Sequence, residues 1–492
     1  MTQPMHRRIA GIAGAVLVLL SVAAAARASE FGDDLKARRA RAMERLGQDS
    51  LLVMWSAPTA RYSRDIDYEY RQDSNLYYLT GLTQEDTMLV LMPGNQARRE
   101  ILFIKERNPA LEHWRGKSLS VDEAKVLTGI DTVLTTNQFE PFVTAMLTHQ
   151  GFGAIGDQEA ARFFDALAAG HARVDLLLDP DRGLNDPLTP PLEFAKKIRE
   201  GFIGFETVDA TKVLSDLRLV KTAYERKVLV TSFDISNDAQ IAGMRAAHAG
   251  AFEYEVKAAV EAVFRARGAW GWSYPSIVGS GPNATILHYP EGDRQMQAGE
   301  LLLVDAAANF QYMADDITRT YPVSGAYSQT QKDIYQIVLQ AQDEGIKAAR
   351  PGASLQTIHQ RTVDVVKAGL LKLGLITDAG GDQYRIWYTH GASHYIGIDV
   401  HDVGDRAHPL EPGMAFTIEP GIYIRQSALD ALPRTAENIA FIDKVQAAVK
   451  KYNDIGVRIE DSFLLEETGL RNLSAAVPKS VDAVEALLRT RR

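Results

Sequence analysis

The sequence contains no cysteine. Without a thiol, the chain cannot form a disulfide bond or carry a lipid on a lipobox cysteine, and it cannot bind a metal ion through thiolate. Any metal site must therefore be built from carboxylates and imidazoles, and the fold must be stable without covalent cross-links.

Positive charge is not in excess either, because 54 Lys and Arg stand against 63 Asp and Glu, a net charge of −9. Binding to nucleic acid or to an anionic membrane requires a basic surface, so we predict neither kind of partner. A chain of 492 residues with 46% hydrophobic and 24% charged residues is typical of a globular protein with more than one core.

Hydrophobic runs long enough to cross a bilayer are also missing. The most apolar stretch, residues 9–20, is too short to span comfortably. It follows Arg7-Arg8 and precedes Ala26-Arg27-Ala28, an arrangement typical of a cleavable signal peptide. We therefore predict a signal peptide over residues 1–28 and a periplasmic or secreted mature chain that begins near Ser29. An uncleaved anchor is the alternative.

Residues 29–207 alternate between helical and strand patterns, which predicts an α/β domain without a catalytic cluster. Tyr70–Gly81, YRQDSNLYYLTG, is predicted to be an aromatic-rich strand, and Pro187, Pro190 and Pro191 to form a loop. The expected helices are residues 35–46, 121–127 and 139–148, and the expected strands are residues 50–55, 88–92, 101–104 and 174–178.

Residues 208–492 have a different pattern, in which a pair of helices followed by a strand-rich segment occurs twice. The predicted helices are residues 215–247, 254–267, 329–349 and 354–373. Strand-rich segments follow each pair, at residues 272–320 and 389–460. Two similar halves of this kind can enclose a site between them, so we expect an α+β catalytic domain here.

A hairpin is predicted over residues 300–320, with a buried strand at Leu301–Val304 and a returning strand at Ile317–Tyr321. If it is centred between residues 310 and 311, Asp305 lies opposite Asp316. Directly opposed like charges destabilise a sheet, and in an apolar setting they require a shared proton or a cation. The alternative is that Asp305 ends a strand and Asp316 caps a turn.

Three of the 11 histidines, His390, His394 and His401, lie close together in the sequence. His390 and His394 share a face in either a helix or a strand. His401 lies an odd number of positions from His394, so a bend or a second strand must return it to the same side.

Two glutamates follow apolar strand patterns. Glu419 ends the run 414–419 before Pro420-Gly421, and Glu460 shares a face with Arg458 in the run 456–460. Each could be a simple charge at a strand end. Together with Asp305, Asp316 and His394, however, they form an oxygen-rich set that suits Mn²⁺, Co²⁺, Fe²⁺ or Zn²⁺, and four carboxylates neutralise two divalent ions.

The order of these motifs resembles the pita-bread metallopeptidases, in particular the Xaa-Pro aminopeptidases (the aminopeptidase P family), with prolidases, creatinases and methionine aminopeptidases as relatives. The motifs that carry the resemblance are YRQDSNLYYLTG, IVGSGPNATILHY, LLLVDAA, DDITRTYPV, HGASHYIGIDVHDVG, FTIEPGIYI and GVRIED. The resemblance implies an aminopeptidase P-like domain at residues 29–207 and a pita-bread catalytic domain at residues 208–492.

Transferred position by position, the resemblance implies two divalent ions, most simply Mn²⁺, with Co²⁺ or Zn²⁺ as alternatives. Their ligands would be Asp305, Asp316, His394, Glu419 and Glu460, of which Asp316 and Glu460 would bridge the ions. Glu419 would also move the proton to the leaving nitrogen, and His288 and His401 would stabilise the transition state. His390, Tyr423 and Arg458 would line the pocket for the prolyl ring.

The resemblance implies cleavage between an N-terminal residue and a following proline in peptide substrates, by a homo-oligomer (dimer or tetramer). A prolidase acting on Xaa-Pro dipeptides is the main alternative; a creatinase-like hydrolase, a methionine aminopeptidase and a non-catalytic pita-bread binding module fit less well. Two departures from the family pattern are Ala306, where glycine is usual, and a longer stretch between Ile424 and Gly456.

Overall fold

The computed structural model describes residues 30–178 and 181–490. The predicted signal peptide, residues 1–28, lies outside the described residues. Contacts divide the chain into two compact units, Met1–Arg218 and Leu219–Arg492. Among the described helices, none is both long enough and apolar enough to cross a membrane.

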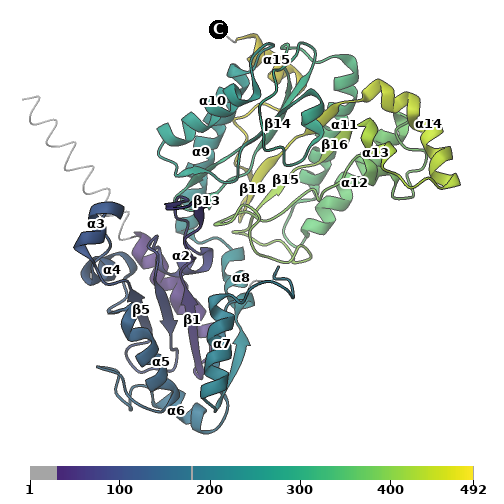
Figure 1. Ribbon diagram of the computed structural model, residues 1–492. Coiled ribbons are helices and arrows are strands. Elements are labelled where there is room, and N and C mark those ends of the chain that lie inside the picture. Colours follow the sequence, from purple (N-terminus) through teal and green to yellow (C-terminus); the bar gives the residue numbers. More distant parts are fainter. Residues whose placement is uncertain (1–29, 179–180, 491–492) are drawn as a thin grey trace, which may run out of the picture. The chain divides into compact units, whose positions relative to one another are not determined.

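The first unit is built on a six-stranded mixed sheet in the order β6-β5-β4-β1-β7-β8 (Figure 1), which confirms the predicted α/β class. Its strands are β1 Ser50–Trp55, β4 Met88–Leu91, β5 Glu100–Ile104, β6 Thr132–Thr135, β7 Ala172–Leu176 and β8 Phe205–Asp209, with a separate hairpin of β2 Arg61–Ser63 and β3 Ile66–Asp67. Its helices are residues 30–46, α2 Ser74–Thr80, α3 Pro109–Arg115, α4 Val121–Thr128, α5 Phe139–Leu147, α6 Ala161–Ala168, α7 Pro190–Gly201 and α8 Thr211–Leu219.

Two predictions for this unit were wrong. The aromatic-rich segment forms helix α2 rather than a strand, because Asp73 accepts a hydrogen bond from the backbone N–H of Leu76 and Gly81 ends the helix at φ 68°. Pro190 begins helix α7 instead of extending a loop, since a proline at the first helical position loses no hydrogen bond.

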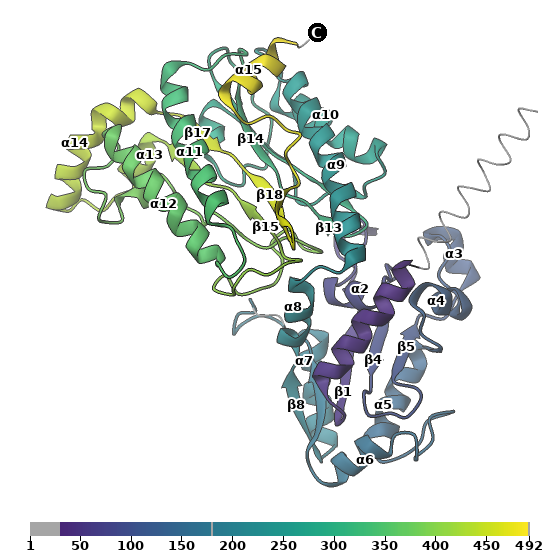
Figure 2. The same ribbon diagram turned by 180° about the vertical axis from the view of Figure 1, so that it is seen from behind.

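The second unit is α+β, and its strands form several small sheets flanked by two pairs of long helices (Figures 1 and 2). Its helices are α9 Ala223–Ala246, α10 Glu253–Ala266, α11 Gln329–Ala348, α12 Leu355–Lys372, α13 Gln426–Asp430, α14 Ala436–Tyr452 and α15 Val481–Arg489. Its strands are β9 Gly271–Trp272, β10 Ile277–Ser280, β11 Leu301–Asp305, β12 Ala308–Phe310, β13 Met313–Ala314, β14 Thr318–Pro322, β15 Ala415–Ile418, β16 Gly421–Ile424, β17 Ile455–Arg458, β18 Asp461–Glu466 and β19 Gly469–Asn472.

The single helix predicted over residues 215–247 is interrupted, so this prediction was also wrong. α8 ends at Leu219, and α9 begins after Thr222, whose side chain accepts from the backbone N–H of Glu225 while the Glu225 carboxylate accepts from the Thr222 N–H. This capping box starts a new helix, because it satisfies two of the N–H groups that a helix start leaves without a partner.

The hairpin around residues 300–320 has a different register from the predicted one. In the pairing of β11 with β14, Asp305 lies opposite Thr318 and not Asp316. The shift is two residues, and side chains alternate with a period of two, so Asp316 stays on the side of the ladder that Asp305 faces. The predicted direct pairing of Asp305 with Asp316 was therefore wrong, although both carboxylates face the same site.

The long stretch after Ile424 contains helices α13 and α14. Figures 1 and 2 show α14 at the edge of the second unit, beyond α11 and α12. These residues therefore form a folded peripheral element rather than a long open loop.

Candidate metal centre and substrate pocket

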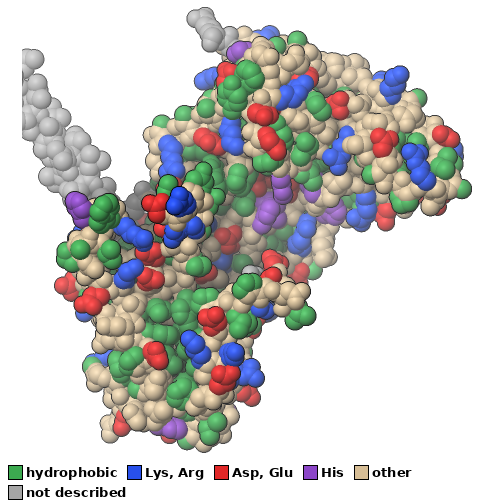
Figure 3. Space-filling view, in the orientation of Figure 1, with side chains coloured by type: hydrophobic (Ala, Val, Ile, Leu, Met, Phe, Trp, Pro, Cys, Tyr) green, Lys and Arg blue, Asp and Glu red, His purple; other side chains and the backbone are tan. Residues whose placement is uncertain are grey.

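A cavity of about 810 Å³ lies among the strands of the second unit, and most of the predicted site residues line it. On the same unit, histidine side chains gather on one face (Figure 3). The predicted residues on the cavity wall are His288, Asp305, Asp316, His390, His394, His401, Glu419, Arg458 and Glu460. Tyr423, which is 3% exposed, lies directly behind this wall and hydrogen-bonds to two of its members.

The centre of the cavity is formed by Asp316, His394 and Glu460, each of which offers one ligand atom within 4.8 Å of the others. His394 Nε2 lies 3.3 Å from Asp316 Oδ2 and 3.6 Å from Glu419 Oε1. Asp316 comes just before β14, Glu460 lies between β17 and β18, and Glu419 lies between β15 and β16. Strand ends from both halves of the unit therefore supply the ligand atoms.

Burial and mutual repulsion perturb these carboxyl groups. Burial raises the pKa of Asp316 well above its usual range, with further increases from Asp305 and Glu419. Burial, together with Asp316, raises the pKa of Glu460 in the same direction. The pKa of Glu419 rises to about 8, mainly through burial and then through Glu460. Such a cluster is stable in its ionised form only with cations among the carboxylates.

The donor atoms fit divalent cations. Thr318 Oγ1 donates to Glu460 Oε2 at 2.7 Å, whereas the buried Glu460 Oε1 has no hydrogen-bond donor within the described part of the chain. Carboxylate oxygens and an imidazole nitrogen, with no thiolate, are ligands for hard or borderline divalent ions. The structure brings the ligand atoms of Asp316, His394 and Glu460 together and places Glu419 beside His394, whereas the Asp305 carboxylate accepts from Tyr274 and Arg458.

Arg458 does more than line the pocket, because its guanidinium connects three side chains around the site. Its Nη2 donates to Asp305 Oδ2 at 2.5 Å, its Nη1 to the Tyr423 hydroxyl at 2.8 Å, and its Nε to Thr318 Oγ1 at 3.1 Å. The Tyr423 hydroxyl is also 2.8 Å from His390 Nε2. Burial, followed by the charge of Arg458, lowers the pKa of His390 to about 3, so this ring is a neutral part of the wall.

His401 returns to His394 through a bend. The backbone N–H of Asp402 donates to the carbonyl of Tyr395 at 2.9 Å, and the His394 and His401 rings then lie edge to face with their centroids 4.5 Å apart. Burial, followed by His394 and His288, lowers the pKa of His401 to about 4. A neutral imidazole beside the predicted metal ligands can donate a hydrogen bond to a developing oxyanion.

Sequence reasoning missed Tyr274. Its hydroxyl lies 2.5 Å from both Asp305 Oδ1 and Asp316 Oδ1, and burial next to these carboxylates raises its pKa well above the usual value. No local pattern indicates this role, because Tyr274 precedes β10, which reaches Asp305 only through pairing with β11. The apolar wall, which includes Ile277, Leu287 and Tyr289, was missed for the same reason.

Comparison with known proteins assigns a protein family to a part of each unit. Residues 230–467 match Metallopeptidase family M24, and residues 35–153 match the aminopeptidase P, N-terminal domain family. The chain is 32% identical to a Xaa-Pro aminopeptidase of Haemophilus influenzae over 93% of this chain and 97% of that protein. It resembles the structure of aminopeptidase P from Escherichia coli with the inhibitor Pro-Leu at 31% identity and a TM-score of 0.77, covering 94% of this chain and 99% of the other. A zinc-substituted E. coli aminopeptidase P in complex with product matches with the same identity and coverage and a TM-score of 0.75.

Proposed function

Because the chain belongs to metallopeptidase family M24 and carries an aminopeptidase P N-terminal domain, it is a metallo-aminopeptidase, and we propose that it removes the N-terminal residue from peptides whose second residue is proline. The observation that supports this specificity most directly is the buried carboxylate–imidazole centre beside the wall of His390, Tyr423 and Arg458. We further propose that the centre holds two divalent ions, most simply Mn²⁺, since four carboxylates balance two such charges.

We also propose that the protein forms a homo-oligomer, and light scattering of the purified protein would test this.

The residues that line the cavity support the catalytic roles that we propose. Divalent ions bound there would supply a nucleophilic hydroxide near neutral pH and polarise the scissile carbonyl. Glu419, whose carboxylate lies 3.6 Å from both His390 Nδ1 and His394 Nε2, accepts the proton of the attacking water and passes it to the prolyl nitrogen. His401 and His288 line the same cavity and stabilise the oxyanion. The flat wall at His390 accommodates a ring better than a long side chain.

The proposed substrate is tested with three synthetic peptides: an Xaa-Pro dipeptide, an Xaa-Pro-Yaa-Zaa tetrapeptide, and the same tetrapeptide with alanine for proline. We expect a clear preference for the proline tetrapeptide in kcat/KM, because the enzyme needs the prolyl ring and not a free prolyl carboxylate. Cleavage of the dipeptide alone would identify a prolidase, for which Arg458 offers a cation to the carboxylate. Equal cleavage of both tetrapeptides would contradict the proposed role of the wall.

His401 is expected to act on the transition state more than on metal binding. His401→Ala should lower kcat by about 10²–10³-fold, which is typical of losing one positioned hydrogen-bond donor, while the metal content remains near that of the parent. His408→Ala, at a half-exposed imidazole that pairs with Glu411, is the matched control and should leave kcat unchanged. Loss of metal from His401→Ala would make His401 a ligand instead.

We also propose that the protein is exported, on the basis of Arg7-Arg8, the apolar run 9–20 and the small residues 26–28. N-terminal sequencing of the protein from fractionated cells should give a start near Ser29 in the periplasmic or secreted fraction. An intact Met1 in the cytosolic fraction would contradict export.

A further inference from the structure

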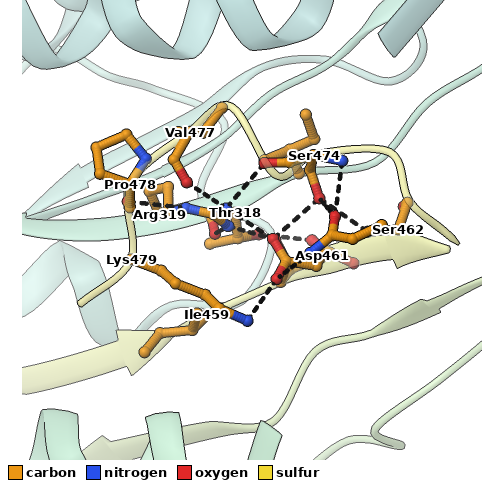
Figure 4. A network of polar contacts seen from close by, with 12 residues as sticks. Thr318, Arg319, Ile459, Asp461, Ser462, Ser474, Val477, Pro478 and Lys479 are labelled. Carbon is orange, nitrogen blue, oxygen red and sulfur yellow. Dashed lines mark hydrogen bonds and ion pairs between the residues drawn. The ribbon is translucent and has the colours of Figure 1, made fainter. Parts of the chain in front are cut away.

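Behind the metal centre, on the side away from the cavity, lies a buried polar network centred on Arg319 (Figure 4). Arg319 is on β14 next to Thr318, so the two side chains point to opposite faces of the strand. Thr318 meets the Glu460 carboxylate, whereas the Arg319 guanidinium donates to the Glu460 backbone carbonyl at 2.5 Å. Two neighbouring residues of one strand therefore hold Glu460, Thr318 through its carboxylate and Arg319 through its backbone carbonyl.

The guanidinium is 1% exposed and uses all of its nitrogens. Besides the Glu460 carbonyl, it donates to Asp461 Oδ1 at 2.6 Å and to the Val477 carbonyl at 2.9 Å. Its further contacts are the carbonyls of Thr318, Ser474 and Pro478. A buried arginine with this many acceptors has one well-defined position, because a planar fork of N–H groups fits only one arrangement of oxygens.

Asp461 connects Arg319 to the C-terminal segment Asn472–Lys479. Its carboxylate, which is fully buried, accepts from Lys479 Nζ at 2.7 Å, from Ser474 Oγ at 2.9 Å and from Asn472 Nδ2 at 3.1 Å. Each oxygen of this carboxylate therefore has a cationic donor, Arg319 at Oδ1 and Lys479 at Oδ2.

The same network reaches the second bridging candidate, Asp316. Ser462 Oγ donates to the Asp316 backbone carbonyl at 2.8 Å, and the Ser462 N–H donates to Ser474 Oγ at 3.1 Å. Ser474 thus joins the backbone behind Asp316 to the carboxylate of Asp461, which is next to Glu460 in the chain. On the cavity side, the carboxylates of Asp316 and Glu460 repel each other. On the opposite side, hydrogen bonds from Ser462 and Arg319 to their backbone carbonyls connect the two main-chain segments.

We propose that Arg319 and the C-terminal segment Asn472–Lys479 are positioning elements that fix the separation of Asp316 and Glu460 and so set the affinity of the centre for divalent ions. This inference rests on the proposed function, because it takes these two carboxylates as metal ligands. It assigns a role in metal binding to residues that do not touch the cavity. Loss of such outer hydrogen bonds typically weakens metal affinity by about 10–100-fold.

The test uses the full chain with four substitutions: Arg319→Met, Arg319→Lys, Ser474→Ala and Glu485→Gln. The last is the control, since Glu485 anchors the same C-terminal region through Lys332 Nζ and the Tyr327 N–H, both at 3.1 Å, without contacting Asp461 or Glu460. Metal-free protein is titrated with Mn²⁺ to obtain the dissociation constant, and kcat and KM are measured separately at saturating Mn²⁺.

Arg319→Met and Ser474→Ala should weaken Mn²⁺ binding by about 10–100-fold and lower kcat with little change in KM. Arg319→Lys should fall between these variants and the parent, and Glu485→Gln should lower the Tm without changing the Mn²⁺ constant. If Arg319→Met does not fold, Ser474→Ala and Arg319→Lys decide the matter. Parent-like Mn²⁺ binding in both Ser474→Ala and Arg319→Lys would overturn the inference, and so would an equal loss of Mn²⁺ affinity in Glu485→Gln. A parent protein that binds no Mn²⁺ would instead overturn the proposed metal centre itself.

Discussion

Asp316→Asn is expected to abolish peptidase activity and to remove the stabilisation that divalent ions give the protein. Asp316 lies at the centre of the cluster, 3.3 Å from His394, and the substitution replaces a charged, proposed ligand by a neutral amide of the same shape. Because metal ions supply several kcal/mol of transition-state stabilisation, activity should fall by at least about 10³-fold.

Thermal unfolding provides the second measurement for this variant. In the parent, Mn²⁺ at 100 times its dissociation constant should add about 2.7 kcal/mol of stability per ion and raise the Tm. Asp316→Asn should show little of this increase. Asp382→Asn, at a side chain that is 77% exposed, is the matched loss of one carboxylate and should retain both activity and the metal-dependent increase. Full activity of Asp316→Asn, or of the parent in excess EDTA, would contradict a metal-dependent mechanism.

Arg458→Met is expected to cause a large loss of stability, and the loss should depend on metal. Arg458 is 4% exposed and pairs with Asp305 at 2.5 Å, so the substitution leaves a buried carboxylate without its cation. Breaking a buried ion pair on one side typically costs about 3–5 kcal/mol of unfolding free energy. In saturating Mn²⁺ the loss should be smaller, because bound ions would compensate the charge of Asp305.

Urea unfolding of the parent and the variant, in EDTA and in Mn²⁺, measures both values. Arg458→Lys keeps the positive charge but lacks the fork that contacts Asp305, Tyr423 and Thr318 together, and we expect it to lose less stability than Arg458→Met. Arg471→Met, at an exposed arginine of β19, is the control and should change little. Equal stability of Arg458→Met and the parent in EDTA would show that Arg458 does not compensate Asp305.

Local patterns predicted much of the secondary structure because they depend on neighbours in the chain. The strand Ser50–Trp55 and helices such as Val121–Thr128 follow from apolar periodicity and capping residues. The same reasoning failed at α2, where an Asp73 cap and a Gly81 stop outweighed the strand preference of tyrosine. It also failed at the α8–α9 junction, where the Thr222–Glu225 box starts a new helix inside a continuous helical pattern.

The sequence by itself determined which chemistry this protein can support. The absence of cysteine and the placement of carboxylates and histidines at strand ends limited the site to hard or borderline divalent ions, and the order of the motifs identified the family. The tertiary structure alone decided the two-residue register that places Asp305 opposite Thr318. It also placed Tyr274 against two of the proposed ligands, Arg458 against Asp305, and Arg319 behind Glu460. These contacts join residues far apart in the chain, and only the packing of the strands sets their distances, because the period of a strand fixes which face a side chain occupies but not which partner it meets.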